Sequence, residues 1–210
     1  MSHVVLLGDS IFDNKVYVGS GPDVVQQLRQ RLPHDWKATL LAVDGDTTQG
    51  VSTQLASLPR DASHLVVSVG GNDALMQAGI LVQSVVSVAE SMCRLADVAA
   101  QFEAGYRKML DALLKHNLPT AVCTIYDPRF DEPMQQKVAV AGLCHFNDVI
   151  LRCAISRGLP VLDLRLICNE YSDYANEIEP GVPGGAKISD AVARLVTQHD
   201  FSARRTSIFV

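Results

Sequence analysis

Short apolar runs alternate along the chain with segments whose apolar residues recur at helical spacing. The first run, Val4-Val5-Leu6-Leu7, has no polar residue within it, which is typical of a strand buried on both faces of a parallel sheet. Further strand candidates follow at residues 36–43, 65–69, 119–126 and 159–164. Helical spacing is found between and after them, at about residues 22–32, 48–55, 102–114, 133–157 and 188–196. This alternation predicts an α/β fold with one parallel sheet of about five strands.

The pattern also predicts the domain organisation. The 210 residues are enough for one domain with a sizeable core, and no internal repeat or low-complexity tract interrupts the pattern. We therefore expect a single domain over residues 1–200 and a C-terminal tail over residues 201–210. For this tail a disordered segment, an edge strand and a dimer contact are all open. The apolar residues of 74–100 favour a buried helix, and a lid or the wall of an acyl pocket is the alternative.

Composition and charge narrow the classes of function. Hydrophobic residues make up 48% of the chain and charged residues 20%, as in folded globular proteins, and the formal net charge is −5. Because the chain has no basic stripe to neutralise phosphates, we expect no nucleic-acid partner. A small or uncharged substrate fits this charge balance better. The chain also lacks the glycine-rich phosphate-binding motifs, and acidic residues next to Ser10 would repel a phosphate.

The cysteines and the start of the chain bear on the cellular compartment. The five cysteines are odd in number and form no CxxC pair, so we interpret them as reduced thiols. From the residues before the first strand we expect no signal peptide, and we expect no apolar run to approach membrane-spanning length. We therefore expect a cytoplasmic protein with no membrane span, and the oligomeric state is left open.

Three of the predicted strands end in turns rich in glycine and small polar residues. The first turn is Gly8-Asp9-Ser10, the second is Asp44-Gly45-Asp46-Thr47-Thr48, and the third is Gly70-Gly71-Asn72-Asp73. The carboxyl ends of parallel strands lie at one edge of a sheet, which is where ligands bind in open α/β folds. We therefore expect the three turns to converge on one cleft, with the Ser10 hydroxyl as the candidate nucleophile.

These turns and their order resemble the SGNH (GDSL-type) hydrolases. The resemblance implies a three-layer αβα, flavodoxin-like sandwich and an esterase or acyl hydrolase that forms an acyl-Ser10 intermediate on a small-molecule ester. It also implies an oxyanion hole made by the backbone amides of Ser10 and Gly45 and the side-chain amide of Asn72. Such donors stabilise the negative charge that develops when a hydroxyl attacks an ester carbonyl. No cofactor and no metal is expected.

The carboxyl-terminal part of the chain departs from the family pattern. The family places its base in a D-x-x-H-P block before the last helix, and here Asn176 stands at the aspartate position and Glu179 at the histidine position. Three explanations are open. Glu179 acts on Ser10 directly, with a pKa raised by burial; or the cleft binds an acyl or acetyl ester with weak or no hydrolysis; or a histidine arrives from elsewhere.

The remaining histidines and carboxylates are expected to be structural. His145 falls within a predicted helix and His64 directly precedes a predicted strand, and the other four are expected at the surface: His3, His34, His116 and His199. Several acidic residues are expected at the same edge as Ser10, as caps and solvated turns rather than as ligands of a divalent cation: Asp9, Asp13, Asp46, Asp73 and Asp173.

Overall fold

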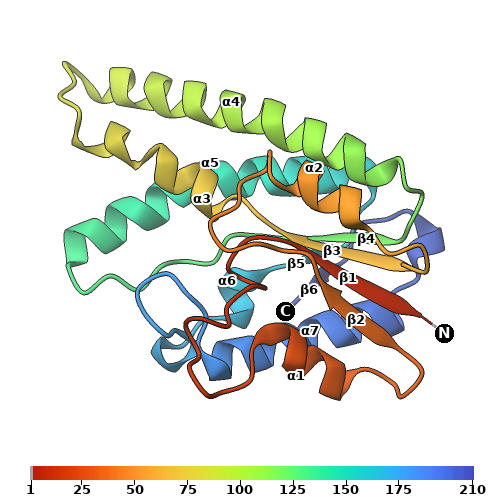
Figure 1. Ribbon diagram of the computed structural model, residues 1–210. Helices are drawn as coiled ribbons and strands as arrows, with labels where there is room; N and C mark the ends of the chain where they lie inside the picture. The colour runs from red at the N-terminus through yellow and green to blue at the C-terminus, as the bar shows by residue number, and fades with distance from the viewer. Residues whose placement is uncertain (1) are drawn as a thin grey trace.

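A sheet of parallel strands forms the centre of the computed structural model, which describes residues 2–210 (Figure 1). Within these residues the sheet has six strands in the order β2-β1-β3-β4-β5-β6. They are β1 (His3–Gly8), β2 (Lys37–Leu40), β3 (His64–Ser68), β4 (Thr120–Cys123), β5 (Val161–Leu162) and β6 (Ile208–Phe209). Apart from the additional edge strand, this is the order of the flavodoxin-like doubly wound sheet. The predicted α/β fold is confirmed, with one strand more than the five expected.

Helices cover both faces of the sheet and complete the predicted three layers (Figure 1). One face carries α1 (Val24–Arg31), α6 (Leu164–Ile167) and α7 (Val182–Gln198). The other carries α2 (Val51–Gln54), α4 (Val88–Leu114) and α5 (Pro133–Arg157). The remaining helix, α3, and four 3-10 turns lie in the connections: α3 (Gly71–Met76), η1 (Leu55–Ser57), η2 (Ala78–Val82), η3 (Tyr171–Asp173) and η4 (Phe201–Ala203).

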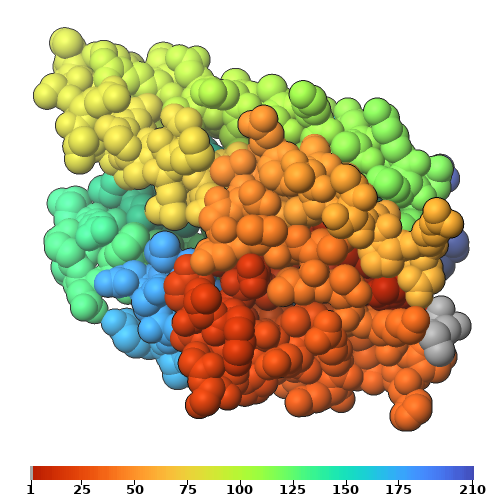
Figure 2. Space-filling view, viewed as in Figure 1, coloured from red at the N-terminus to blue at the C-terminus, as the bar shows by residue number. Residues whose placement is uncertain are grey.

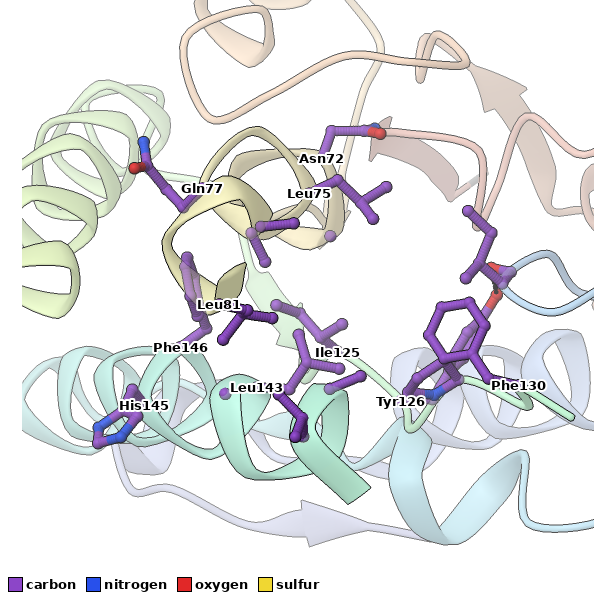
Figure 3. Close-up of a pocket in the computed structure, with 18 of the residues that line it drawn as sticks. Asn72, Leu75, Gln77, Leu81, Ile125, Tyr126, Phe130, Leu143, His145 and Phe146 are labelled. Carbon is purple, nitrogen blue, oxygen red and sulfur yellow. Dashed lines mark hydrogen bonds between the residues drawn. The ribbon is translucent and has the colours of Figure 1, made fainter. Parts of the chain in front are cut away.

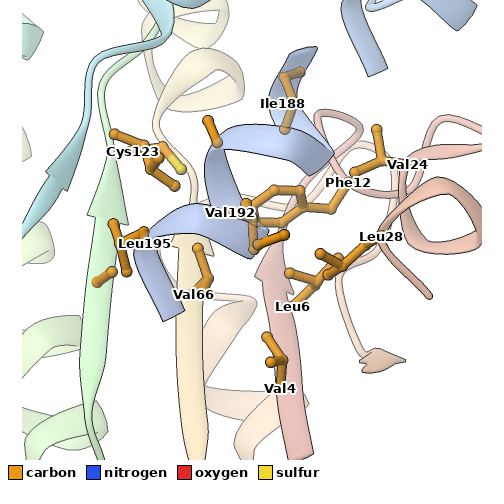
Figure 4. Close-up of a cluster of buried hydrophobic side chains, with 14 of the residues drawn as sticks. Val4, Leu6, Phe12, Val24, Leu28, Val66, Cys123, Ile188, Val192 and Leu195 are labelled. Carbon is orange, nitrogen blue, oxygen red and sulfur yellow. The ribbon is translucent and has the colours of Figure 1, made fainter. Parts of the chain in front are cut away.

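The apolar run of β1 divides its side chains between two cores. Val4 and Leu6 point to the face of α1 and α7, where Figure 4 shows Leu6 beside Leu28 and Phe12. Val5 and Leu7 belong to the core beneath α2, α4 and α5. Successive side chains of a strand point to opposite faces, so a strand covered on both sides needs apolar residues at every position. This explains why the run has no alternation.

The segment that precedes and opens α4, here called the projecting segment, does not belong to the core. The prediction of a buried helix over residues 74–100 was therefore wrong for most of that range. Met76, Val82, Val86 and Val88 are 75–97% exposed. In Figure 2 this segment, drawn in yellow, projects beyond the body of the molecule. The buried side chains of α4 begin only at Phe102. The alternative of a pocket wall, considered below, fits this exposure better.

The last residues of the chain join the sheet. Ile208 and Phe209 of β6 pair with Val161 and Leu162 of β5 in parallel register. The segment 201–210 therefore supplies an edge strand, which is one of the three possibilities for this tail. A two-residue strand gives too little sequence signal to be predicted from apolar pattern.

Helix α5 qualifies the expectation that no segment approaches membrane-spanning length. It has 25 residues and an 18-residue window of mean hydropathy 1.5, which is long and apolar enough to cross a membrane by length and composition. The core helix of a soluble protein can pass the same test. Here Phe146, Val149 and Ile150 of α5 are buried in the core beneath α4.

We expect leucines of the core and of the projecting segment to differ in their contribution to stability. Leu110 of α4 is fully buried, so Leu110→Ala should lower the free energy of unfolding by about 2–5 kcal/mol. Leu81 of η2 is 44% exposed, so Leu81→Ala should cost less than about 1 kcal/mol. Urea unfolding of both variants measures the two changes. Equal losses would contradict the assignment of the projecting segment to the surface.

Candidate active site

The turn that follows β1 places Ser10 at the carboxyl edge of the sheet. Gly8 has φ +124°, and a Cβ at this position would overlap the carbonyl oxygen of Ser68 on β3. The Asp9 amide donates to that same carbonyl at 3.1 Å. Only glycine fits this close approach of two backbones, so the strand can turn sharply here and present the next residues to the cleft. Ser10 is 7% exposed.

Glu179 is the hydrogen-bond partner of the Ser10 hydroxyl. Ser10 Oγ donates to Glu179 Oε1 at 3.1 Å, although the two residues are 169 positions apart in the chain. Glu179 is 6% exposed, and within residues 2–210 no donor reaches its second oxygen, Oε2. The structure thus brings together the two residues that the first explanation of the missing histidine requires.

The loop that carries Glu179 is held by side chains at both of its ends. Asn176 Oδ1 accepts the backbone N–H groups of Ile178 and Glu179, both at 2.9 Å. Asn14, which is fully buried behind the Ser10 turn, donates from Nδ2 to the Pro180 carbonyl at 3.0 Å. The residue at the family's aspartate position therefore orders the loop backbone, and no hydrogen bond joins its side chain to the Glu179 carboxylate.

Burial sets the ionisation of the two carboxyl groups at the turn. Desolvation, with a smaller contribution from the Asp44 charge, raises the pKa of Glu179 to about 7, and the hydrogen bond from Ser10 opposes this shift. Desolvation also raises the pKa of Asp9 to about 8; its hydrogen bond from the Ile11 amide acts against this, and the charges of Glu179 and Asp73 add to it. Both carboxyl groups therefore keep their protons to higher pH than solvated carboxyl groups do.

The second and third turns lie next to each other, as their proposed donor role requires. Asn72 Nδ2 donates to the carbonyl of Asp46 at 2.9 Å, which leaves one of the two hydrogens of this amide group free. Gly45 has φ +83° and is exposed. Among the backbone hydrogen bonds within residues 2–210, none has the Ser10 or the Gly45 amide as its donor. Both N–H groups are therefore available to a ligand.

Gln54, which was not among the predicted site residues, connects the first two turns. From the buried face of α2 its side chain accepts the Gly8 N–H at 2.8 Å and donates to the Gly8 carbonyl at 2.7 Å. The same amide nitrogen donates to Asp46 Oδ2 at 2.6 Å. The only sequence signal for this role is a polar residue on an otherwise apolar helix face, next to Val51 and Leu55.

Thr48 and Asp73 make a corresponding connection between the second and third turns. Asp73 accepts both the Thr48 N–H, at 3.0 Å, and the Thr48 hydroxyl, at 2.7 Å. Together with the bonds of Gln54 and Asn72, these contacts hold the three turns as one hydrogen-bonded unit.

No histidine among residues 2–210 forms a hydrogen bond with the Ser10 hydroxyl, whose partner is the Glu179 carboxylate. His3 was expected at the surface, and that was wrong: it is 6% exposed, with hydrogen bonds to Asp61 and Thr39 near the start of β1. It is buried because β1 begins inside the sheet. His145 lines the cavity described below, at the end remote from Tyr126 (Figure 3).

The other acidic residues of this edge have separate partners. Within residues 2–210, no group of three or more His, Cys, Asp or Glu side chains is arranged to hold a metal ion. The donors to these carboxylates are the Asp44 amide for Asp13, Gln54 for Asp46, Thr48 for Asp73 and Lys187 for Asp173.

A cavity of about 590 Å³ opens beside Ser10. Asp9, Ser10, Asn72 and Glu179 line one part of it, whereas Gly45 does not. The remaining lining is mostly apolar and comes from α3, η2, α4 and α5, together with the residues that follow β4. Figure 3 shows Leu75 and Leu81 on one side of this space and Leu143 of α5 on the other.

The sequence matches the family model of the GDSL-like Lipase/Acylhydrolase family over residues 6–182. The chain belongs to this family. The resemblance stated from the three turns is thereby confirmed, and the family is one of ester hydrolases. A comparison with curated protein sequences gave no match.

Solved structures of esterases and lipases share the fold of this GDSL-family chain. An extracellular lipase from Streptomyces rimosus has a TM-score of 0.70 at 16% identity, covering 95% of this chain and 100% of its own. The acetyl xylan esterase AlAXEase has a TM-score of 0.67 at 16% identity, covering 90% and 96%. Est24, a carbohydrate acetylesterase from Sinorhizobium meliloti, has a TM-score of 0.66 at 11% identity, covering 94% and 99%. Identities this low establish the fold alone.

The raised pKa of Glu179 predicts a pH-dependent penalty on stability. Because the folded state holds this proton more tightly than the unfolded state, stability falls as pH rises from about 4.5 to about 7. Glu179→Gln removes the titrating group, so the free energy of unfolding of the variant should exceed that of the unmodified protein by roughly 1–3 kcal/mol at pH 8 and by little at pH 4. Denaturant unfolding at several pH values measures the difference. Glu177 is exposed on the same loop, so Glu177→Gln is the control. If the difference in unfolding free energy between Glu179→Gln and the unmodified protein is the same at every pH, the burial argument is contradicted.

Proposed function

We propose that this chain is a serine esterase that hydrolyses small-molecule carboxylic esters through an acyl-Ser10 intermediate, with Glu179 as the general base. The observation that carries the proposal is the buried hydrogen bond of 3.1 Å from Ser10 Oγ to Glu179 Oε1. A nucleophile within hydrogen-bond reach of a base is the arrangement that covalent catalysis requires. Membership of an ester-hydrolase family supports the same reaction class.

In the first step the Ser10 oxygen bonds to the ester carbonyl carbon, and its proton passes to Glu179 Oε1. The carbonyl oxygen becomes an oxyanion, for which the free N–H groups of Ser10 and Gly45 and the remaining N–H of Asn72 are the proposed donors. When the bond from the carbonyl carbon to the alkoxy oxygen breaks, protonated Glu179 returns the proton to that oxygen. An alcohol leaves, and the acyl group stays on Ser10.

In the second step a water molecule takes the place of the hydroxyl. Glu179 accepts a proton from the water as its oxygen bonds to the acyl carbon, and the bond to Ser10 Oγ then breaks. The proton returns to Ser10, and a carboxylic acid is released. The same base therefore serves both halves of the reaction, and the proposed chemistry requires no cofactor.

A buried carboxylate can act here without a third residue. A histidine base becomes a cation when it accepts the proton, and the aspartate of a triad stabilises that cation. Glu179 instead becomes neutral on accepting the proton, and burial favours the neutral form. An aspartate at position 176 would have no cation to stabilise. The two replacements in the family's D-x-x-H-P block thus fit one mechanism, in which Asn176 positions the loop.

The two proposed catalytic side chains predict a specific pattern of activity. For a 4-nitrophenyl ester, kcat/KM should rise with pH and level off above about pH 7, because only ionised Glu179 accepts the proton. Ser10→Ala should lower kcat/KM at least 10³-fold, and Glu179→Gln by about 10²–10⁴-fold. A fluorophosphonate probe should label Ser10 in the unmodified protein.

The control for this experiment is Glu177→Gln, which should keep the activity and the pH profile. Turnover that survives Ser10→Ala unchanged would contradict the mechanism. A folded protein that is neither labelled nor active would favour the alternative function, a binding module for an acyl or acetyl ester. The carboxylate at the position of the family's histidine is the observation that keeps this alternative open.

A further inference from the structure

We propose that the cavity beside Ser10 binds the acyl chain of a medium-chain fatty ester, and that Gly142 sets the length of chain accepted. This inference rests on the proposed function, since it names the acyl group that Ser10 would carry. It distinguishes a fatty ester from the acetyl and carbohydrate esters that the fold also accommodates in other proteins.

The size of the cavity exceeds what an acetyl group needs. A water molecule has a share of about 30 Å³ in the liquid, so about 590 Å³ has room for roughly twenty groups of that size. An acetyl group would fill only a small part of this space. An acyl chain of about eight to fourteen carbons would fill much of it, with Ser10 at its carbonyl end.

The chemistry of the walls matches an unsubstituted chain. Beyond the reaction site the lining is mostly apolar, with side chains such as Leu75, Leu81, Val98 and Leu143. Only a few polar residues interrupt it: Gln77, Glu132, Gln135 and His145. A sugar would need hydrogen-bond partners for its hydroxyl groups along these walls. A hydrocarbon chain needs none and gains from leaving water.

A bound acyl chain would explain why the projecting segment exposes apolar side chains. Leu75 and Leu81 are 49% and 44% exposed, yet both line the cavity, because the cavity is open to solvent on their side. Large exposed apolar surfaces mark places where another apolar group binds. A chain lying between this segment and α5 would cover these side chains, as the arrangement in Figure 3 indicates.

Gly142 lies in the part of α5 that lines the cavity. A Cβ built at this position would meet no heavy atom within 4 Å, so the glycine leaves open space that a side chain would occupy. Glycine is a poor residue for a helix interior, so a larger residue here should strengthen α5 rather than weaken it. Gly142→Leu therefore fills the cavity without disturbing the fold.

The test compares 4-nitrophenyl acetate with 4-nitrophenyl octanoate. Each methylene that leaves water contributes up to about fourfold, so the unmodified protein should prefer the octanoate at least 100-fold in kcat/KM. Gly142→Leu should lower kcat/KM for the octanoate at least tenfold and change that for the acetate less than twofold. The matched control is Ala141→Leu, since Ala141 is exposed on the same helix and does not line the cavity; it should change neither value.

A binding measurement separates this inference from the proposed function. Calorimetric titration of Ser10→Ala with methyl octanoate should show binding that is weakened at least tenfold by adding Gly142→Leu and is unaffected by adding Ala141→Leu. If neither aryl ester is hydrolysed but this binding pattern holds, the proposed esterase fails and the acyl site stands. If acetate is hydrolysed as well as octanoate, or if Gly142→Leu leaves both octanoate turnover and methyl octanoate binding unchanged, the acyl site is overturned.

Discussion

The buried hydrogen bond between the Ser10 hydroxyl and the Glu179 carboxylate is the interaction on which the rest of this site depends. Ser10 leaves the first strand of the sheet, and Glu179 comes from the loop just before the last long helix. Removing a carboxylate from water is unfavourable, so the protein must hold Glu179 in place by other contacts. The Asn176 side chain, which accepts the Glu179 amide, and the hydrogen bond from Asn14 to the Pro180 carbonyl hold the loop in place. The unfavourable burial is also what raises the pKa of Glu179 into the range that suits a base at neutral pH.

The proposed oxyanion hole is built differently, from the backbone amides of two turns and the Asn72 side chain of the third. Parallel strands deliver the turns to one edge, but strands alone do not fix where an individual amide points. Gln54 fixes the first turn against the second, and Asn72 and Asp73 fix the second against the third. The amides of Ser10 and Gly45 are left free within this unit. If these groups act as the proposed oxyanion donors, they need no rearrangement when negative charge develops on a substrate.

Much of this arrangement could be predicted from the sequence, for a physical reason. Unbroken apolar runs such as 4–7 and glycine-rich turns after them are local signals, and parallel topology converts them into one shared edge. The position of Glu179 was predictable only from the resemblance to a family. The contacts of Gln54 and Asn14 were not predictable, because they join side chains to backbone groups of segments far apart in the chain. Apolar composition also does not distinguish a core from the wall of an open cavity, which is why residues 74–100 were misassigned.

The ionisation of Glu179 in the folded protein tests the account most directly. We would label the glutamate carboxyl carbons with ¹³C, follow their signals by NMR from pH 3 to pH 9, and assign Glu179 by its absence in Glu179→Gln. If burial raises the pKa of Glu179 as described, one glutamate titrates near pH 7. Its pKa should rise further in Ser10→Ala, because the hydrogen bond from the hydroxyl stabilises the carboxylate. A Glu179 signal that titrates at about 4.3, as in a solvated peptide, and that does not respond to Ser10→Ala would contradict it.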